Sequence, residues 1–355
     1  MRPAFLTKIF MVALVSFSGL ALFQGPAHAA IPIGQLSALQ GKVELIREGK
    51  SLPLTLKMAV LALDRIKVDE GLAEVTFMDD STIKISPNTE MTLDQKEKKK
   101  KILGIWSKTY LSRLIKIVKG AVSGNFRKSE QLVTEFETPV LVAAVRGTLL
   151  TVSQNPDGST RLEVDQGVVE SYTLGNDGWT YMELQDGARI GVYVDPVSGA
   201  ASVHNYGTVQ VQVQTGDTIA TVDQGATATS KIEDDGSSTF LATDGEIVLQ
   251  TGDTTTTLVK DAAANTKKDA QGNVSVQNVS VDPTKDIQVK VGTQTKTVTK
   301  GNKVDSTQGT LSDVGPPAPF IAPPKAPPPP PPDPSTSTGN EQQGKTSQDP
   351  KGTYR

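Results

Sequence analysis

Side chains that could catalyse a reaction or hold a metal are few in this chain, and their spacing matches no known site. The 355 residues contain no cysteine and two histidines, of which only His204 lies beyond the first 29 residues. A zinc site needs several His, Cys or carboxylate ligands. A serine triad needs its nucleophile in a recognisable elbow, and the Gly-x-Ser-x-Gly pattern does not occur. We therefore expect no catalytic residue, no metal and no cofactor.

Three weaker patterns could still bind a ligand. Residues 339–346 fit the letters of a phosphate-binding loop, but such a loop works between a buried strand and a helix. Here a proline run precedes it and a polar tail follows, so we expect no nucleotide binding. Residues 234–236 (Asp-Asp-Gly) lack the ligand series of a calcium loop, and a hairpin turn is the preferred interpretation. Paired carboxylates acting on a polysaccharide stay open, because their separation depends on the fold.

Two stretches, residues 71–93 and 138–152, carry the strongest pattern in the chain. In the first, Ala73, Val75 and Phe77 alternate with polar residues, and a turn of two aspartates and a serine follows. Alternation with a period of two between polar turns is typical of half-buried strands. Aromatic residues are few, whereas glycine is common, which also favours strands and turns over packed helices.

Together these stretches resemble the FecR domain, a bacterial cell-envelope module known from regulators of iron-siderophore uptake. The resemblance covers about residues 35–195 and implies an all-β fold of the β-solenoid or β-roll type. The family usually has glycine where this chain has aspartate in the first turn, and aspartate tolerates the left-handed conformation. The motif residues, with a structural or partner-binding role implied, are Asp79, Asp80, Ser81, Asn88, Thr138, Pro139, Arg146, Gly147 and Thr148.

Arg146 is the most telling motif residue, because it follows the apolar run 140–145. Burying a charged side chain at the end of such an apolar run costs free energy unless the charge is paired. Our preferred hypothesis is a structural one, in which the guanidinium satisfies a carboxylate or turn carbonyls beside Gly147. The alternative is that Arg146 contacts a ligand.

A basic segment interrupts the strand pattern. Five of residues 96–101 are lysine, and Leu103, Trp106, Tyr110 and Leu114 follow at helical spacing. We predict a basic helical insertion near 96–112 whose apolar side covers the β core. The alternative is an amphipathic helix that lies on an anionic surface.

The second half of the chain shows a weak repeat. Glycine-bounded strands begin near residues 167, 207, 245 and 286, about 40 residues apart. Repeats of this length predict a stack in which each copy buries its face on its neighbour. We expect each unit to consist of short β-hairpins turned at glycines.

The two ends of the chain have different compositions from its middle. Residues 1–29 combine basic residues, a 15-residue apolar run and an Ala-His-Ala site, which indicates a cleaved secretory signal rather than a retained anchor. Twelve prolines lie between residues 316 and 334, so this segment should be an extended rod followed by a disordered end. The formal net charge of −3 offers no general attraction for nucleic acid.

These observations predict four parts: a signal peptide at 1–29, a FecR-like β domain at 30–205, a β-repeat region at 206–311 and a proline-rich disordered tail at 312–355. The regulators of the family reach a sigma factor through a cytoplasmic segment and one membrane helix. This chain instead resembles stand-alone exported members, located in the periplasm or at the cell surface.

We expect a non-enzymatic binding, scaffold or signalling-accessory protein whose partner is an envelope protein or a cell-wall polymer. It would act through its FecR-like domain, by exposed sheet edges or faces. The alternatives are an adhesive protein that binds glycan or peptidoglycan, and a polysaccharide-active enzyme. A flat, Thr-rich face would favour adhesion, whereas a groove lined by acidic and aromatic residues would favour the enzyme.

Overall fold

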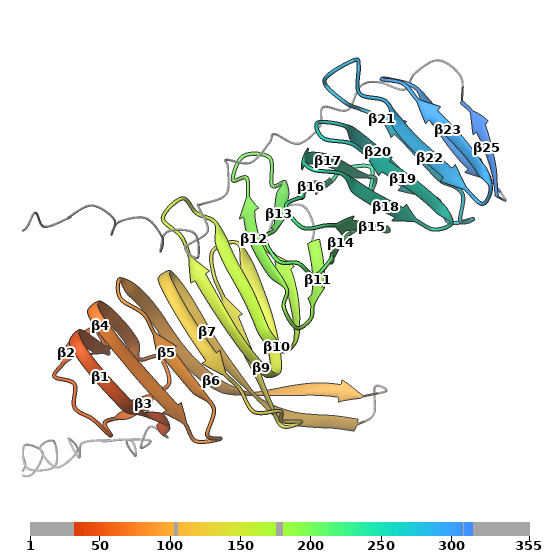
Figure 1. The fold of residues 1–355 in the computed structure, drawn as a ribbon. Coiled ribbons are helices and arrows are strands. Elements are labelled where there is room, and N and C mark those ends of the chain that lie inside the picture. Colours follow the sequence, from red (N-terminus) through yellow and green to blue (C-terminus); the bar gives the residue numbers. More distant parts are fainter. Residues whose placement is uncertain (1–31, 103–105, 175–179, 308, 315–355) are drawn as a thin grey trace, which may run out of the picture. The chain divides into compact units, whose positions relative to one another are not determined.

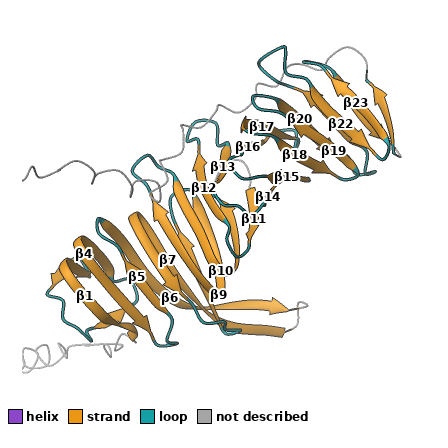
Figure 2. Cartoon of the chain, viewed as in Figure 1, coloured by secondary structure: helices purple, strands orange, loops and turns teal. Residues whose placement is uncertain are grey.

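The computed structural model describes residues 32–102, 106–174, 180–307 and 309–314. Within these ranges the chain forms 25 β-strands and no helix (Figure 2), which confirms the all-β prediction. Accordingly, no helix of the described residues is long and apolar enough to cross a membrane. The predicted signal peptide, the phosphate-loop pattern and the proline-rich segment lie outside the described ranges.

The first ten strands form the part of the chain that contains both sequence signatures (Figure 1). They are β1 (Pro32–Arg47), β2 (Lys50–Leu52), β3 (Ala59–Leu61), β4 (Arg65–Phe77), β5 (Thr82–Ile85), β6 (Thr89–Ile102), β7 (Trp106–Asn125), β8 (Leu132–Glu137), β9 (Leu141–Gln154) and β10 (Thr160–Thr173). Several are far longer than the five or six residues of a common strand, and they bend so that one strand joins two different sets of neighbours. The second half of β10, for example, pairs with β11 while its first half pairs with β12.

Glycines make these bends possible. Gly41 of β1 lies directly opposite Gly71 of β4 in the register, and both have a positive φ. A Cβ at Gly71 would collide with the backbone oxygen of Gln40. A side chain is therefore excluded by conformation and by space, because L-residues rarely adopt this φ. Gly147 and Gly167 make a similar close approach between β9 and β10.

The remaining strands alternate between two ladders. Ladder A contains β11 (Thr180–Leu184), β14 (Val211–Thr215), β15 (Thr218–Val222), β18 (Ile247–Thr251), β19 (Thr254–Leu258), β22 (Ile287–Val291) and β23 (Gln294–Val298). Ladder B contains β12 (Arg189–Val194), β13 (Ala201–Asn205), β16 (Thr227–Ile232), β17 (Ser238–Asp244), β20 (Ala263–Lys268), β21 (Val274–Asn278), β24 (Lys303–Thr307) and β25 (Thr310–Asp313). Successive hairpins are added first to one ladder and then to the other.

The predicted hairpin repeat is visible in this alternation. The strands β14, β18 and β22 lie within the segments that the repeat predicted near residues 207, 245 and 286, and each opens a hairpin of ladder A. The segment 233–237 is the turn between β16 and β17, so residues 234–236 are a hairpin turn as expected. All described strand pairs except β7–β8 are antiparallel. The β-solenoid part of the prediction is therefore not confirmed.

The core of the second half lies between the two ladders. Inward residues such as Leu249 of ladder A and Phe240 of ladder B are fully buried in one apolar cluster. One margin of this core is built from hydroxyl groups that bond across the ladders. The Oγ1 of Thr215 lies 2.8 Å from the Oγ of Ser230, and the Oγ1 of Thr218 lies 2.8 Å from that of Thr266. These buried hydroxyls are paired, so they do not carry the cost of an unsatisfied polar group.

The C-terminal end of the stack carries polar side chains at positions that face the core elsewhere. Lys296 of β23 lies opposite Val289 in the register, and its Nζ is 2.6 Å from a carboxylate oxygen of Asp313 in β25. Gln294 accepts a hydrogen bond from the backbone nitrogen of Leu311 at 3.0 Å. The last described strand, β25, ends at Asp313, one residue beyond the predicted start of the tail at residue 312.

The predicted helical insertion near 96–112 is wrong. Residues 90–102 of β6 pair with residues 106–119 of β7 in a long antiparallel ribbon. Trp106, Tyr110 and Leu114 are four residues apart, and four is a multiple of the strand period of two, so the same spacing fits one side of a strand. The buried residues of β7 include Ser112, Arg113, Ile115 and Ile117. Because these residues form strands, the alternative of an amphipathic helix on an anionic surface is wrong as well.

The glycine bend at Gly71 can be tested by substitution. We expect Gly71→Ala to lower the free energy of unfolding by about 3 kcal/mol or more, because it combines a strained φ with a backbone collision. The matched control is Gly49→Ala. Gly49 also has a positive φ, but its Cβ would meet nothing within 4 Å, so about 1 kcal/mol is expected. Equal losses for the two variants in urea unfolding would contradict the role of close approach.

Candidate functional site

The first sequence signature is organised by a buried arginine that the sequence analysis did not select. Arg113 of β7 is 1% exposed, and its Nη2 donates a hydrogen bond to the carboxylate of Asp79 at 2.8 Å. The guanidinium lies 3.7 Å from the centroid of the Phe77 ring, in a cation–π contact. Among the described residues Nη1 has no hydrogen-bond partner. The ion pair with Asp79 is therefore the main compensation for this buried charge.

The protonation of this pair follows from its surroundings. Burial works against ionisation of Asp79, but the hydrogen bonds from Arg113 and Ser81 and the positive charge of Arg113 outweigh it, so the pKa of Asp79 is lowered. Burial lowers the pKa of Arg113, although Asp79 opposes that shift. An arginine keeps its proton at all ordinary pH values. The site is thus an ion pair on the edge of the core.

Asp80 and Ser81 complete the turn between β4 and β5. Asp80 has a φ of 59°, which confirms that aspartate adopts the left-handed conformation where the family has glycine. The Oγ of Ser81 donates to Asp79 at 2.7 Å and accepts from the backbone nitrogen of Arg127 at 3.1 Å. Asn88 lies outside this cluster, at an exposed turn before β6 with a φ of 58°.

The second signature meets the first at the segment 126–128. The backbone nitrogen of Phe126 donates to the carbonyl of Thr148 at 2.9 Å, one residue before Arg127 bonds to Ser81. The buried Oγ1 of Thr148 donates to the carbonyl of Val168 at 3.2 Å. These motif side chains therefore fasten strands to one another. We infer from this geometry that Ser81 and Thr148 build the fold rather than contact a ligand.

Thr138 and Pro139 lie at a separate corner between β8 and β9. The buried Oγ1 of Thr138 accepts hydrogen bonds from the backbone nitrogen of Leu141 at 3.0 Å and from Thr160 at 2.8 Å. Pro139 is exposed and lines a hollow of about 410 Å³ with residues that include Tyr193. The structure therefore spreads the motif residues over several places and does not assemble them into one site.

Arg146 is not the buried structural arginine that we expected. Its side chain is exposed at the bend of β9, and within the described chain it has neither an ion pair nor a side-chain hydrogen bond. Gly147 follows with a φ of 66°, and a Cβ there would lie 2.9 Å from the Cβ of Lys128. Arg127 and Lys128 are exposed as well, and Arg127 forms an ion pair with Asp80. This exposure differs from the burial that the structural hypothesis assumed, and both the structural role and the ligand contact stay predictions.

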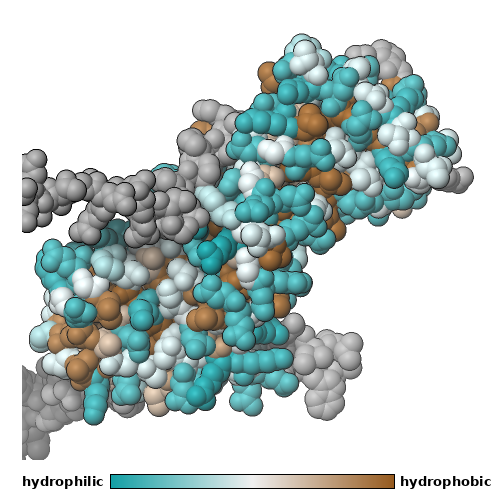
Figure 3. Space-filling view, viewed as in Figure 1, coloured by the Kyte–Doolittle hydropathy of each residue, from teal (hydrophilic) through white to brown (hydrophobic). Residues whose placement is uncertain are grey.

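A broad exposed surface lies on the outward side of ladder A, which we call the A face. Its side chains follow one another across the strands in register, and none of them is buried. Most are glutamine or threonine, and hydrophilic residues also cover most of the side of the molecule visible in Figure 3. One row of the A face runs Tyr181, Gln214, Ile219, Gln250, Thr255, Lys290 and Thr295, and the next runs Glu183, Gln212, Thr221, Val248, Thr257, Gln288 and Thr297.

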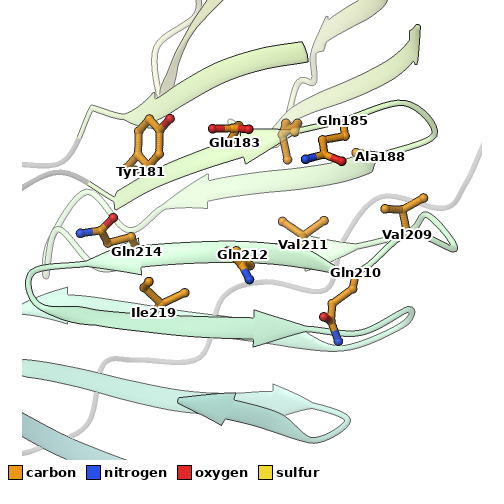
Figure 4. Close-up of a pocket in the computed structure, with 11 residues that line it drawn as sticks. Tyr181, Glu183, Gln185, Ala188, Val209, Gln210, Val211, Gln212, Gln214 and Ile219 are labelled. Carbon is orange, nitrogen blue, oxygen red and sulfur yellow. The ribbon is translucent and has the colours of Figure 1, made fainter. Parts of the chain in front are cut away.

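The A face is hollowed over β11 and β14 (Figure 4). The two strands pair from Thr180 to Glu183, and a depression of about 320 Å³ lies over paired residues and the adjoining residues Leu184, Gln185 and 209–211. Tyr181, Glu183, Gln212 and Gln214 line it, as Figure 4 shows. A phenol, a carboxylate and several amides make this the most suitable place for a polar ligand on ladder A.

The electrostatics around the hollow are mildly acidic. Glu170 of β10 lies directly opposite Glu183 in the register, and Tyr172 lies opposite Tyr181. Burial first, and then the charges of Glu170 and Glu183, raise the pKa of Tyr181. Its hydroxyl therefore stays protonated and can donate or accept a hydrogen bond at physiological pH.

The arrangement offers little for catalysis. Glu183 is the one acidic residue among those that line the hollow, and both it and Glu170 are exposed. A glycosidase acid needs a raised pKa, which burial normally supplies. His204 is half-buried beside Thr227, at 2.7 Å, and burial lowers its pKa. Among the described residues no group of three or more His, Cys, Asp or Glu side chains could hold a metal ion.

Sequence reasoning missed both Arg113 and the hollow, although one signal was present. Arg113 is two and four residues before Ile115 and Ile117 in β7, so strand alternation would have turned it inward with them. The expected helix hid this alternation. The hollow could not be found from the sequence, because it depends on which strands pair with one another.

The ion pair of Asp79 and Arg113 can be tested by removing one charge. We expect Asp79→Asn to lower the free energy of unfolding at pH 7 by about 3 kcal/mol, because Arg113 is left buried and uncompensated. The matched control is Asp80→Asn. The pair of Asp80 with Arg127 is exposed, with about two thirds of each side chain accessible, so less than about 1 kcal/mol is expected. Losses of equal size would contradict the role of burial.

The same pair predicts a dependence on pH. The pKa of Asp79 is lowered in the folded chain, so its stabilising contribution is present above the unfolded pKa of about 3.9 and is lost as pH falls through the folded pKa. The stability difference between the unchanged chain and Asp79→Asn should therefore shrink below about pH 4. Chemical unfolding at a series of pH values measures it, and a constant difference would contradict the assignment.

Comparison with known proteins agrees with the first signature. Residues 64–170 match the family model described as FecR protein, whereas no curated protein matches the chain. Two crystal structures of a "putative anti-sigma factor" from Parabacteroides distasonis ATCC 8503 share 18% and 19% identity with this chain, with TM-scores of 0.29 and 0.30. Each match covers 40% of this chain and 59% of the other protein. The segment that contains Asp79, Arg113 and Arg146 is therefore a FecR domain, spanning residues 64–170.

Proposed function

We propose that this chain is an exported, non-enzymatic binding protein of the bacterial cell envelope that acts as a scaffold or signalling accessory. The FecR domain at residues 64–170 carries this proposal. The apolar run and small-residue site within residues 1–29 support export. The partner would be an envelope protein, held by non-covalent contact with the outward side of the β ladders.

The A face is the surface we assign to the partner. Its outward residues are all accessible, while the inward residues of the same strands are buried in the core. A broad, regular surface of glutamine and threonine suits an extended segment that makes many weak polar contacts. The hollow beside Tyr181 gives such a segment one place to anchor a larger group.

A second candidate function is adhesion to a glycan or to peptidoglycan. The flat Thr- and Gln-rich A face favours it, because amides and hydroxyls match the hydroxyl groups of sugars. Tyr181 supplies an aromatic surface beside Gln214 in the hollow, and aromatic rings combine apolar area with a polar tip. The enzyme hypothesis has less support, because Glu183 and its register partner Glu170 are both exposed, whereas the acid of a glycosidase is normally buried.

The absence of cysteine allows the A face to be tested in living cells. Gln214→Cys would place a unique thiol at the hollow for a short thiol-reactive photocrosslinker. We expect this variant to capture an envelope protein after export. The matched control is Lys268→Cys, which places an equally exposed thiol in β20 of ladder B. Equal capture at both positions, or recovery of the chain from the cytoplasm, would contradict the proposal.

A binding assay distinguishes the glycan-binding alternative from the proposed binding of an envelope protein. If the A face binds peptidoglycan, Tyr181→Ala should weaken cosedimentation with purified sacculi by about tenfold, as expected for the loss of one central aromatic contact. Tyr193→Ala in ladder B is the control, since Tyr193 is also half-exposed but lies away from the hollow. If the unchanged chain does not sediment with sacculi, the protein-partner assignment stands alone.

A further inference from the structure

The hollow of the A face adjoins two carboxylates of like charge. Glu170 of β10 and Glu183 of β11 lie directly opposite each other in the antiparallel register, and both are exposed on the outward side of the sheet. Among the described residues neither side chain forms an ion pair or a hydrogen bond. Like charges in opposite positions of a sheet destabilise it. The folded chain therefore keeps an unfavourable pair of charges beside its hollow.

The neighbouring carboxylates on the same outward side are neutralised. Glu135 of β8 belongs to the same row and lies two strands from Glu170. The Nζ of Lys98 is 3.1 Å from a carboxylate oxygen of Glu135. In the next row, the Nζ of Lys116 is 2.6 Å from a carboxylate oxygen of Glu137. The sheet thus supplies a lysine to each of these carboxylates, but within the described chain it supplies none to the pair beside the hollow.

Two tyrosines lie beside the unneutralised pair. Tyr172 and Tyr181 are opposite each other in the adjacent row. The charges of Glu170 and Glu183 help to raise the pKa of Tyr181, after the larger effect of burial, so both carboxylates act on this phenol. The face of an aromatic ring attracts a cation through its quadrupole. A cation at this place would be stabilised by the ring and by the two carboxylates together.

The hollow continues from these charges onto apolar side chains. Val209 and Ile219 line it together with Glu183, and Figure 4 shows that they come from different segments. Lysine and arginine side chains have the same two-part character, an apolar stem that ends in a charge. The volume of about 320 Å³ is at the lower limit for ligand pockets. It therefore suits one long side chain rather than a folded element.

We propose that the hollow binds a lysine or arginine side chain of the partner protein, with its cationic group beside Glu170 and Glu183 and its stem against Ile219. This inference rests on the proposed function, because it names the group that anchors the partner on the A face. The cation removes the repulsion between the two carboxylates, whereas a neutral side chain leaves it in place. Such charge complementarity selects a partner segment that carries a basic residue.

The repulsion can be measured in the free chain. We expect Glu183→Gln to raise the melting temperature by about 1–3 °C, because it removes one of two like charges in opposite positions. The control in the same row is Glu135→Gln, which breaks the ion pair with Lys98 and should not raise the melting temperature. A melting temperature that Glu183→Gln lowers or leaves unchanged would overturn the proposal.

Fluorine NMR of the purified chain, labelled with fluorotyrosine, tests the cation directly. The chain contains six tyrosines, and Tyr181→Phe assigns the signal of Tyr181. The probes are peptides acetyl-Gly-Thr-X-Thr-Gly-amide, in which X is lysine, arginine or the uncharged norleucine. We expect the lysine and arginine peptides to shift the Tyr181 signal at low ionic strength, and the norleucine peptide to leave it in place.

A pair of double variants separates the site from the general charge of the chain. Glu170→Gln combined with Glu183→Gln should weaken binding of the lysine peptide about tenfold, because two exposed ion pairs are lost. Glu48→Gln combined with Glu130→Gln removes the same charge from exposed positions elsewhere and should leave binding unchanged. Equal shifts with the norleucine and lysine peptides would overturn the proposal, and so would equal weakening by the two double variants.

Failure of this inference can be told apart from failure of the proposed function. The peptide titration needs no cellular partner, so a negative titration overturns the cation site whatever Gln214→Cys captures in cells. A positive titration combined with capture of a protein supports both. If Gln214→Cys captures a peptidoglycan fragment in place of a protein, the proposed function fails, and the assignment of the cation to a protein side chain is overturned with it.

Discussion

The close approach of backbones at glycine bends is the constraint on which the first ten strands of this chain depend. At Gly41 and Gly71 two paired strands come so near that neither position can carry a Cβ. Each bend lets one continuous strand leave one set of partners and join another, as β10 does when it pairs with β11 and β12. The two ladders of the second half therefore start from a single bent hairpin. A side chain at these positions would force the paired strands apart. The long strands could then no longer bend from one set of partners to the next.

From that origin the chain builds two ladders with different outer faces. Antiparallel hairpins are added alternately to the two ladders, and every second side chain of each strand is buried in the core between them. The side chains between these point outward and differ between the ladders: ladder A has Gln212 and Gln214 on its outer face, whereas ladder B has Ser202 and Thr229. Long polar side chains reach into solvent, whereas the short hydroxyl groups of ladder B bond to one another. The two outer faces therefore differ in the length of their side chains.

Strand alternation made much of this architecture predictable. It placed the β4–β5 turn, the left-handed Asp80 and the later hairpins near their observed positions. The prediction from alternation failed where a spacing of four residues fits both a helix and a strand. For this reason the lysine-rich segment around Trp106 was assigned to a helix. The same error hid Arg113. Arg146 was chosen as the buried charge because it ends an apolar run, but a strand alternates, and the residue after Val145 faces outward.

The hydrogen-bonded register explains why the site itself lay beyond sequence reasoning. Glu170 and Glu183 are separated by a turn, and Gln214 belongs to another hairpin, yet pairing puts all three strands side by side. Such neighbours are fixed by the alternation between ladders, which no local pattern reveals.

The end of the stack shows how the repeating pattern is brought to a stop. A repeat whose units bury their faces on one another needs a terminal unit that resists further addition. Here an inward position of β23 carries Lys296, held by Asp313 of the last strand of ladder B. An inward-pointing charge on an edge strand makes pairing with another chain costly, because a new strand would bury it. The same residues therefore end the core and protect the open edges.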